Sequence, residues 1–439
     1  MKQIWLYLSV CSLFSVLCSL SSCREESDDV PSFGQVDYLN FYEANSNFKG
    51  QFEAIWTALN CNYALWDYEE KHGLDWDKTY SDFLPKFIEL DKRQNNRETI
   101  KDDEILSLYK EVISPLHDGH LSLYVKNPQD KKSLLILKES ISPADIRNSK
   151  REDYADKAPS EKDYYYNESI DKNRIIEADK STNGKYEYCL FEDDVVYLRL
   201  ADFRLSDSLD LFFSAKDKPR NSVQRIWMKW FNKICDLHEA QKLKGIIIDI
   251  RDNGGGYAAD LDYAIGALQP SDTTHYSWLG YNRIKTGIGR LDYSVLIPSI
   301  LPRMNHNHIA ITDEPIAILV NCNSASTAEL CCLSAKKMKN AHIIGMQTWG
   351  ALSSLFSMSA QDMYSITYSG HVGSVDIFNS ENSFFIYIPH EAFFSDDFEI
   401  LESIGIKPDI EVRLDNNLYQ TTGRDTQLER ALEYIHTGK

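Results

Sequence analysis

The chain has 439 residues, of which 43% are hydrophobic and 12% aromatic, and its formal net charge at pH 7 is −19. A chain of this length and hydrophobic content can bury a sizeable core, which excludes a wholly disordered protein and predicts two or three domains. A nucleic-acid surface needs clustered Lys and Arg to neutralise phosphates, so with this acidic balance we expect no DNA or RNA partner.

The first 22 residues are typical of a secretory signal peptide. Lys2 precedes a short apolar run at residues 4–20, which serines interrupt. The run ends in Leu20-Ser21-Ser22-Cys23, which resembles the lipobox of bacterial lipoproteins, where cleavage precedes the cysteine and its thiol is acylated. An ordinary signal peptide with a chance cysteine is the alternative. The resemblance implies a lipid anchor on Cys23 and an exported lipoprotein of the outer membrane, on its periplasmic face or at the cell surface.

Two segments follow this cysteine. Residues 23–40 hold several acidic residues together with Pro, Ser and Gly and show little periodicity, so we expect an acidic tether there. Residues 41–116 carry apolar side chains at every third or fourth position, as at Phe52, Ile55 and Leu59, which is the spacing of helices buried on one face. This second segment is therefore predicted to form a small helical-bundle domain.

Residues 117–184 are predicted to connect the helical domain to the core through a strand at 121–125 and a long charged excursion. From residue 185 to 415, continuous apolar runs alternate with helical segments, a pattern typical of a sheet that helices cover on both faces. The apolar runs lie at 195–200, 245–250, 315–320 and 341–345. We expect an α/β core in a chain that is α+β overall, with a C-terminal helix within residues 416–439.

Six cysteines follow Cys23, and none of them forms a CxxC pair or a Cys/His spacing of the zinc type; they are Cys61, Cys189, Cys235, Cys322, Cys331 and Cys332. We expect buried thiols, although export would allow some of them to form disulfides. His306 and His308 also have no partner at a recognisable metal spacing. The spacing of these residues therefore predicts no metal site.

Three stretches have the composition of a catalytic site. In the first, Gly254-Gly255-Gly256 follows the apolar run at 245–250. Consecutive glycines can turn several backbone N–H groups toward one point, as an oxyanion or a phosphate requires. The stretch lacks the Gly-Lys-Ser/Thr of a Walker A loop and the GxGxxG spacing of a dinucleotide-binding loop. A simple tight turn is the alternative.

The second stretch, Ser324-Ala325-Ser326-Thr327-Ala328-Glu329, follows the apolar run at 315–320 and begins a helix. Near a helix N-terminus, Ser326 would meet unsatisfied N–H groups that suit a nucleophile, but serine is also a preferred helix cap. The third stretch, Leu116-His117-Asp118-Gly119-His120, offers two histidines, either of which could activate a serine hydroxyl. The spacing does not decide between His117 and His120.

Together with two further motifs, these stretches resemble one known family, the C-terminal processing peptidases with the tricorn core proteases. Four motifs follow one another in the family's order: Arg251-Asp252-Asn253-Gly254-Gly255-Gly256 after a strand, the segment around Ser326, the turn Gly345-Met346-Gln347-Thr348-Trp349-Gly350, and the closing Gly405-Ile406-Lys407-Pro408-Asp409-Ile410. An upstream helical segment that ends in Asp118-Gly119-His120 resembles the tricorn-like secreted lipoprotein branch. The resemblance covers most of the chain that follows the signal segment.

The resemblance implies an α/β peptidase core with an accessory helical domain. It also implies a serine endopeptidase that cleaves peptides or proteins and needs no cofactor. Carried over by position, the nucleophile is Ser326, and the oxyanion hole consists of the backbone N–H groups of Thr327 and of Gly255 or Gly256.

The base is where this sequence departs from the family pattern. Processing peptidases use a lysine directly after the Gly-x-x-Thr-x-Gly turn, and this position is Ala351. Tricorn-type members use an upstream histidine, here His120, with a glutamate near the closing motif, here Glu402, and a helper serine, which is replaced by Gly119. His120 would then lack one orienting hydrogen bond. Two hypotheses follow: a membrane-tethered, exported serine endopeptidase, or a catalytically silent lipoprotein that binds peptides or proteins on the same fold.

Overall fold

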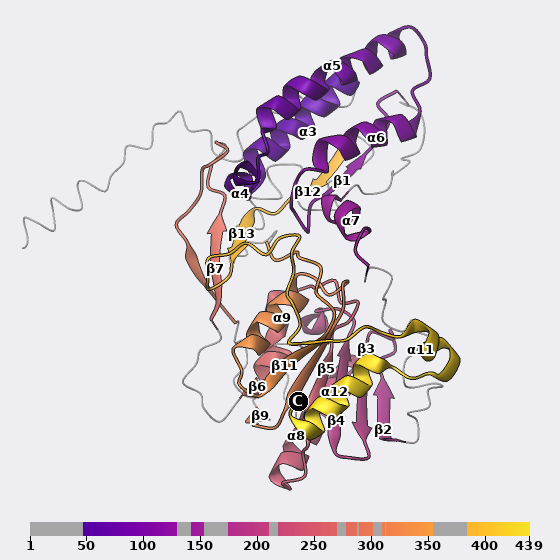
Figure 1. Cartoon of the computed structure of the whole chain (residues 1–439), viewed down its shortest axis with the longest axis vertical. Helices are drawn as coiled ribbons and strands as arrows, with labels where there is room; N and C mark the ends of the chain where they lie inside the picture. Colours follow the sequence, from indigo (N-terminus) through magenta and orange to yellow (C-terminus); the bar gives the residue numbers. More distant parts are fainter. Residues whose placement is uncertain are drawn as a thin grey trace, which may run out of the picture.

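The computed structural model describes residues 47–129, 142–152, 174–209, 218–269, 278–287, 289–301, 310–311, 313–353 and 384–439. The protein is elongated, with a group of N-terminal helices at one end and a large sheet covered by helices at the other (Figure 1). Within the described ranges no helix is long and apolar enough to cross a membrane. The predicted signal peptide, the tether with Cys23, and the pair His306 and His308 lie outside the described residues.

The N-terminal helices pack around one hydrophobic cluster. They are α3 (Phe48–Asn62), α4 (Trp66–Lys71), α5 (Trp76–Asn95) and α6 (Asp102–Ile113). The side chains of Asn47 and Asp75 cap α3 and α5, since each accepts a hydrogen bond from a backbone N–H of the first turn. Phe52 of α3 stacks on Phe87 of α5 with 4.5 Å between the ring centres. A helical N-terminal region is therefore present, as the apolar spacing predicted.

A second part of the chain completes this cluster. Strand β1 (Ser122–Val125) pairs antiparallel with β12 (Phe384–Tyr387), so that two segments far apart in the sequence form one small sheet. Phe384, Ile386 and Ile400 are buried in the same cluster as the N-terminal helices. The N-terminal unit therefore includes residues from the segment 185–415, which the sequence pattern assigned to the core.

The core is a seven-stranded sheet with the strand order β14-β11-β10-β5-β4-β3-β2. Its strands are β2 (Ile175–Lys180), β3 (Tyr186–Phe191), β4 (Val195–Leu200), β5 (Gly245–Asp249), β10 (Ile316–Val320), β11 (Ala341–Gly345) and β14 (Ile410–Glu411). The five neighbouring strands β14, β11, β10, β5 and β4 are parallel to one another. At the opposite edge of the sheet, β3 runs antiparallel to β4, and β2 runs antiparallel to β3. The four apolar runs of the sequence form β4, β5, β10 and β11.

Helices cover both faces of this sheet. On one face, α8 (Ser222–Glu239) and α9 (Thr327–Lys336) belong to the same hydrophobic cluster as Ile246 and Ile318. On the other face, α12 (Thr426–Thr437), which follows the short α11 (Asn416–Thr422), packs with Ile247 and Leu319. Successive strand residues point to opposite faces, which explains why these strands are apolar throughout. The predicted α/β core within an α+β chain is confirmed.

A buried ion pair ties α12 to the end of β5. Arg251 donates to Asp249 at 3.0 Å and to Asp425 at 2.7 Å, and all three side chains are fully buried. Burial alone would raise the pKa of Asp249, but the charge of Arg251 outweighs this effect and lowers it. Asp425 is also the N-cap of α12. The arginine of the Gly-rich motif therefore anchors the C-terminal helix.

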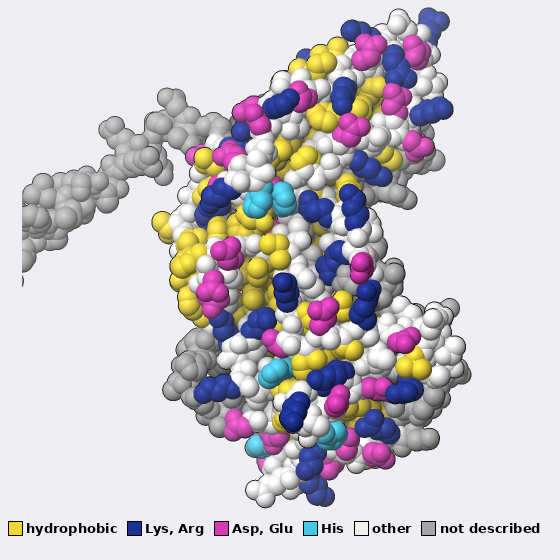
Figure 2. All heavy atoms as spheres, in the orientation of Figure 1, with side chains coloured by type: hydrophobic (Ala, Val, Ile, Leu, Met, Phe, Trp, Pro, Cys, Tyr) yellow, Lys and Arg dark blue, Asp and Glu magenta, His cyan; other side chains and the backbone are white. Residues whose placement is uncertain are grey.

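A smaller sheet lies between the two ends of the molecule (Figure 1). In it, β7 (Trp278–Ile284) pairs antiparallel with β8 (Ile297–Ile300) and with β13 (Glu391–Phe394). Ion pairs join this part to the N-terminal helices, from Arg283 to Asp67 and from Arg290 to Asp77, each at 2.6 Å. Apolar side chains gather around β7 on the face shown in Figure 2. The remaining short elements are β6 (Leu268–Gln269), β9 (Ala310–Ile311), η2 (Leu205–Asp207), η3 (Ala258–Tyr263) and η4 (Ile265–Ala267).

The structure describes six cysteines, and five of them are buried. Burial raises the pKa of the Cys331 thiol to about 12, so this thiol is protonated at neutral pH. The prediction of buried thiols therefore holds for five of the six, Cys235 is only partly buried, and none of the described cysteines forms a disulfide.

Candidate active site

Ser326 lies where the chain turns from β10 into α9, and its backbone is strained. Its φ and ψ angles are 58° and −119°, a combination that residues with a Cβ rarely adopt. Hydrogen bonds to Glu329 hold this geometry: the N–H of Ser326 donates to Oε2 at 3.2 Å, and its carbonyl oxygen accepts from the N–H of Glu329 at 2.8 Å. Backbone strain that surrounding bonds maintain is typical of functional sites.

The carboxylate of Glu329 connects Ser326 to the turn after β11. Its Oε1 accepts hydrogen bonds from Thr348 Oγ1 at 2.6 Å and from the N–H of Gly350 at 2.9 Å. Its Oε2, which binds Ser326, also accepts from the N–H of Ala351 at 2.7 Å. Burial raises the pKa of Glu329 to about 7, although these hydrogen bonds act in the opposite direction. The Gly-x-x-Thr-x-Gly turn thus supports the serine segment through the carboxylate of Glu329.

The Gly-rich turn packs directly against Ser326. Gly255 has a φ of 99°, and a Cβ at this position would lie 2.6 Å from the Cβ of Ser326. Gly256 has a φ of 145°, and a Cβ there would lie 2.1 Å from the carbonyl oxygen of Phe203. No residue with a side chain fits at either position, because the space is filled and the backbone is in the region that favours glycine.

The two glycines differ in what their N–H groups bind. The N–H of Gly255 donates to Asn253 Oδ1 at 2.8 Å. The N–H groups of Gly256 and Thr327 have no hydrogen-bond partner within the part of the chain that the structure describes. The hydroxyl of Thr327 donates to the carbonyl oxygen of Gly256 at 2.9 Å, which holds the two residues together. Gly256 and Thr327 are therefore the pair of backbone donors available beside Ser326.

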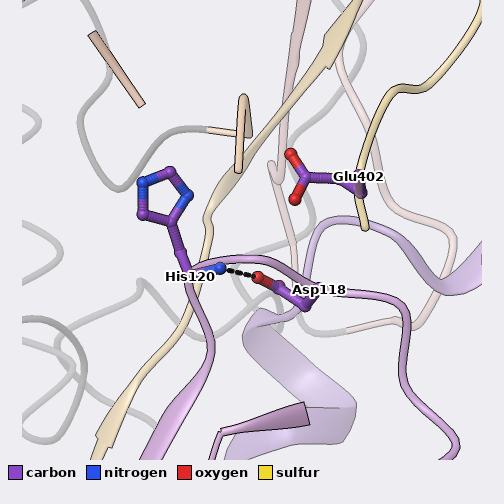
Figure 3. A group of neighbouring side chains, drawn as sticks. All are labelled: Asp118, His120 and Glu402. Atoms are coloured by element: carbon purple, nitrogen blue, oxygen red, sulfur yellow. Dashed lines mark hydrogen bonds between the residues drawn. The ribbon is translucent and has the colours of Figure 1, made fainter. Parts of the chain in front are cut away.

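His120 and Glu402 come from distant parts of the chain and lie close together, with Asp118 beside them (Figure 3). Asp118 shapes the histidine loop, since its Oδ1 accepts from the N–H of His120 at 2.6 Å and from that of Leu121 at 2.8 Å. The Glu402 carboxylate accepts hydrogen bonds from three backbone N–H groups, those of Gly119, Leu352 and Ser353. Polar atoms of Asp118, His120 and Glu402 lie within 4.8 Å of one another.

The other histidine of the loop binds elsewhere. Nδ1 of His117 lies 2.8 Å from Oε2 of Glu69, and the N–H of His117 donates to Oε1 of the same carboxylate at 2.7 Å. Glu69 belongs to α4 and is fully buried. His117 thus attaches the loop to the N-terminal helices, and His120 is the histidine next to Glu402, a distinction that the sequence spacing could not make.

Burial sets the protonation states of these groups. It lowers the pKa of His120 to about 4, although a contact with the backbone of Ser353 acts in the opposite direction. The ring is therefore neutral at pH 7 and able to accept a proton. Burial also raises the pKa of Glu402, and it raises the pKa of Asp118 well above its ordinary value, with a further contribution from the charge of Glu402.

Gly119 and Ala351, the two departures from the family pattern, touch one another. A Cβ on Gly119 would lie 2.0 Å from the carbonyl oxygen of Gly350 and 2.6 Å from the Cβ of Ala351. The indole N–H of Trp349 donates to the carbonyl oxygen of Gly119 at 3.1 Å. The histidine loop therefore packs on the same segment that binds Glu329, which brings this loop and the serine segment to one site. A serine does not fit at position 119 in this arrangement.

A short helix that the sequence patterns did not reveal clamps these loops together. It is α7 (Pro143–Asn148), in the segment predicted as a charged excursion. Arg147 donates to the carbonyl oxygens of Leu116 and Asp118 and to the hydroxyl of Ser403, and Arg151 donates to the carbonyl oxygens of Gln347 and Thr348. Charged runs are usually solvated, so the composition of this segment did not indicate this role.

For Glu329, by contrast, the sequence did contain an indication of its contact with Ser326, because Ser-x-x-Glu at a helix start is the capping-box pattern.

Residues 194–412 match the model of a known family, described as peptidase family S41. A carboxy-terminal-processing protease from Bartonella bacilliformis is 30% identical over 160 residues, which are 36% of this chain and 30% of that relative. The match thus spans less than a third of the relative's length. The chain belongs to peptidase family S41, a family of serine peptidases, and the family predicted from the motifs is confirmed.

Two solved structures share the fold over most of their length. One is a candidate peptidase from Parabacteroides merdae, with a TM-score of 0.55 and 17% identity; the similarity covers 89% of this chain and 97% of that one. The other is mature CPAF in complex with lactacystin, with a TM-score of 0.55 and 12% identity, covering 90% of this chain and 100% of that one. At these identities the similarity establishes the common fold.

Proposed function

We propose that this protein is a serine endopeptidase in which Ser326 is the nucleophile and His120 the base. The observation that carries the proposal is the strained Ser326 at the start of α9, packed against the Gly-rich turn and beside the N–H groups of Gly256 and Thr327. Membership of a family of serine peptidases supports the same assignment.

In the proposed reaction, the neutral imidazole of His120 takes the proton of Ser326 Oγ while this oxygen attacks the carbonyl carbon of a peptide bond. The carboxylate of Glu402 stabilises the imidazolium that forms. The negative charge on the substrate oxygen is accepted by the N–H groups of Gly256 and Thr327, at the positive end of the α9 dipole. His120 then gives its proton to the leaving amine, and a water molecule releases the acyl group by the reverse sequence. These steps use no cofactor.

The environment of Ala351 favours histidine over lysine as the base. The Ala351 side chain is 1% exposed and lies against Gly119, so a lysine at this position would displace the histidine loop. Ala351 and Gly119 also motivated the alternative of a catalytically silent binding protein. The neutral His120 beside the fixed Glu402 carboxylate favours the peptidase instead, because these are the groups that a serine nucleophile needs.

Covalent labelling of the full chain with a fluorophosphonate probe, which reacts with activated serines, tests this proposal. We expect the wild type to be labelled, Ser326→Ala to remain unlabelled, and His120→Gln to react at least about 100-fold more slowly. Ser334→Ala removes another serine of α9, whose hydroxyl bonds within the helix, and His117→Gln changes the other histidine of the loop. Both controls should label like the wild type. An unlabelled wild type, or labelling that survives Ser326→Ala, would leave the silent binding role.

We further propose that the peptidase is an exported lipoprotein, held at the outer membrane by an acyl group on Cys23. The lipobox-like Leu20-Ser21-Ser22-Cys23 after an apolar run supports this proposal. In a Gram-negative host fed with radioactive palmitate, the wild type and Cys61→Ala should incorporate label and fractionate with the outer membrane, and Cys23→Ala should not. Unlabelled wild-type protein in the soluble fraction would instead indicate an ordinary signal peptide.

A further inference from the structure

An arginine lies beside the candidate oxyanion hole, on the segment that follows β4. The N–H of Phe203 donates to the carbonyl oxygen of Gly255 at 2.9 Å, and the N–H of Tyr257 donates to the carbonyl oxygen of Phe203 at 2.7 Å. Phe203 and Gly256 thus pair as residues of parallel strands do. Arg204 follows directly after Phe203, so its side chain starts from backbone that packs against the donor residue Gly256.

The backbone is also fixed on the other side of Arg204. The N–H groups of Leu205 and Ser206, in the short helix η2, donate to the carboxylate of Asp260. Asp260 is fully buried, so the interior of the core holds this part of the chain. A binding group on a fixed backbone loses little conformational freedom when a ligand arrives. Arg204 is therefore preorganised beside the site.

The guanidinium of Arg204 has no carboxylate partner within the part of the chain that the structure describes. It lies over the ring of Tyr257, 5.8 Å from the ring centre, and both side chains are exposed. The nearby carboxylate of Asp202 binds Lys185 and the hydroxyl of Tyr186 instead. The chain has 66 Asp and Glu against 47 Lys and Arg, so carboxylates are abundant. An exposed arginine that pairs with none of those described is available for an anion from outside.

We propose that Arg204 binds an acidic side chain of the substrate, so that the peptidase prefers bonds with Asp or Glu within two residues of the cleavage point. The inference rests on the proposed function, because it takes Gly256 as part of the oxyanion hole. Residues of an extended peptide lie about 3.3 Å apart, so a carboxylate that reaches Arg204 belongs to a residue near the bond held at Gly256. Guanidinium binds carboxylate through two parallel hydrogen bonds, and the ring of Tyr257 covers one face of it.

Digestion of reduced and alkylated serum albumin by the full chain, followed by mass spectrometry of the products, tests this preference. For the wild type we expect Asp and Glu to be at least about threefold more frequent within two residues of the cleaved bonds than in albumin as a whole. Arg204→Gln should lose this enrichment, and Arg204→Glu should replace it with Lys and Arg. Arg424→Gln changes an exposed arginine before α12 that pairs with Glu429, and this control should cleave like the wild type. Cleavage that depends on the distance from the C-terminus would indicate the terminal carboxylate and overturn the inference.

The size of the effect follows from a peptide of the best cleaved sequence and the same peptide with its acidic residue replaced by the corresponding amide. The wild type should have about a tenfold higher kcat/KM for the acidic peptide, as expected of a charge-assisted pair. This ratio should fall to about one in Arg204→Gln. A ratio that the variant retains would show that another group binds the carboxylate.

Peptide binding to Ser326→Ala separates this inference from the peptidase itself. Two pools of fluorescein-labelled random heptapeptides, with aspartate or asparagine fixed at the centre, are titrated in about 0.15 M NaCl, which screens the net negative charge of the chain. We expect the aspartate pool to bind at least about threefold more tightly, and Ser326→Ala combined with Arg204→Gln to bind both pools equally. This result with a wild type that cleaves no bond would refute the proposed peptidase and leave the anion site standing. Equal binding of both pools by Ser326→Ala would overturn the inference whether or not the wild type cleaves.

Discussion

Substitution of Gly119 by alanine adds one methyl group to the histidine loop and tests whether the contact with the following segment positions His120. The added Cβ would lie 2.0 Å from the carbonyl oxygen of Gly350 and 2.6 Å from the Cα and Cβ of Ala351. Real Cβ contacts are essentially never shorter than 3.0 Å, so the loop has to move by about 1 Å from its 2.0 Å contact. Two of these atoms belong to the backbone, and no side-chain rotation relieves the clash.

A displacement of about 1 Å in a catalytic group lowers a rate by about 100-fold, and overpacking a filled site costs about 1–3 kcal/mol. We therefore expect Gly119→Ala to react with the fluorophosphonate probe about 100-fold more slowly than the wild type. The variant should stay folded, with a loss of about 1–3 kcal/mol in the free energy of unfolding measured by urea titration.

Gly254→Ala is the matched control for this variant. Gly254 belongs to the Gly-rich turn near Ser326, but a Cβ there meets nothing within 4 Å and its φ is not positive. This control should keep the wild-type labelling rate. If Gly119→Ala also labelled at the wild-type rate, the position of His120 would not depend on the contact with Ala351, and the argument would be refuted.

Three further predictions concern pH, the α7 clamp and the C-terminal helix. His120 is neutral above its pKa of about 4, so the labelling rate should fall as the pH approaches this value; a rate that stays constant down to this pH would contradict the lowered pKa. Arg147→Ala should lower the labelling rate by about 10–100-fold, and added guanidinium should restore part of it, whereas loss without rescue would indicate general destabilisation. Asp425→Ala leaves the buried charge of Arg251 with fewer partners and should cost about 3–5 kcal/mol in urea unfolding. The exposed helix cap variant Asp415→Ala should cost only about 1 kcal/mol, and equal losses would argue against the buried pair.

The main sheet could be predicted because its signals are local. Each of the runs at 195–200, 245–250, 315–320 and 341–345 is apolar over its whole length, which a strand covered on both faces requires. The pairing of β1 with β12 had no comparable signal, since it joins segments that lie far apart in the chain. Sequence periodicity reports which face of an element is buried but does not identify the element that covers it.

Part of the candidate site could also be predicted, because its motifs are local in the sequence. The motifs around Ser326 and Glu402 are contiguous, and their order along the chain identified the family. The choice between His117 and His120 depends on the carboxylate of Glu69 in α4, which binds the first of them. The difference between Gly255 and Gly256 likewise depends on a side-chain contact, and contacts of this kind become visible only in the folded chain.

The pairing of β1 with β12 also has a consequence for when activity arises. A ribosome releases the histidine loop early and the serine segment later, but β12 and Glu402 emerge only near the end of synthesis. Until then the N-terminal helices lack part of their hydrophobic cluster and the histidine loop lacks the carboxylate that binds it. Domains of this kind cannot fold one after the other from the N-terminus. A nascent or truncated chain would therefore carry the candidate catalytic side chains without an assembled site.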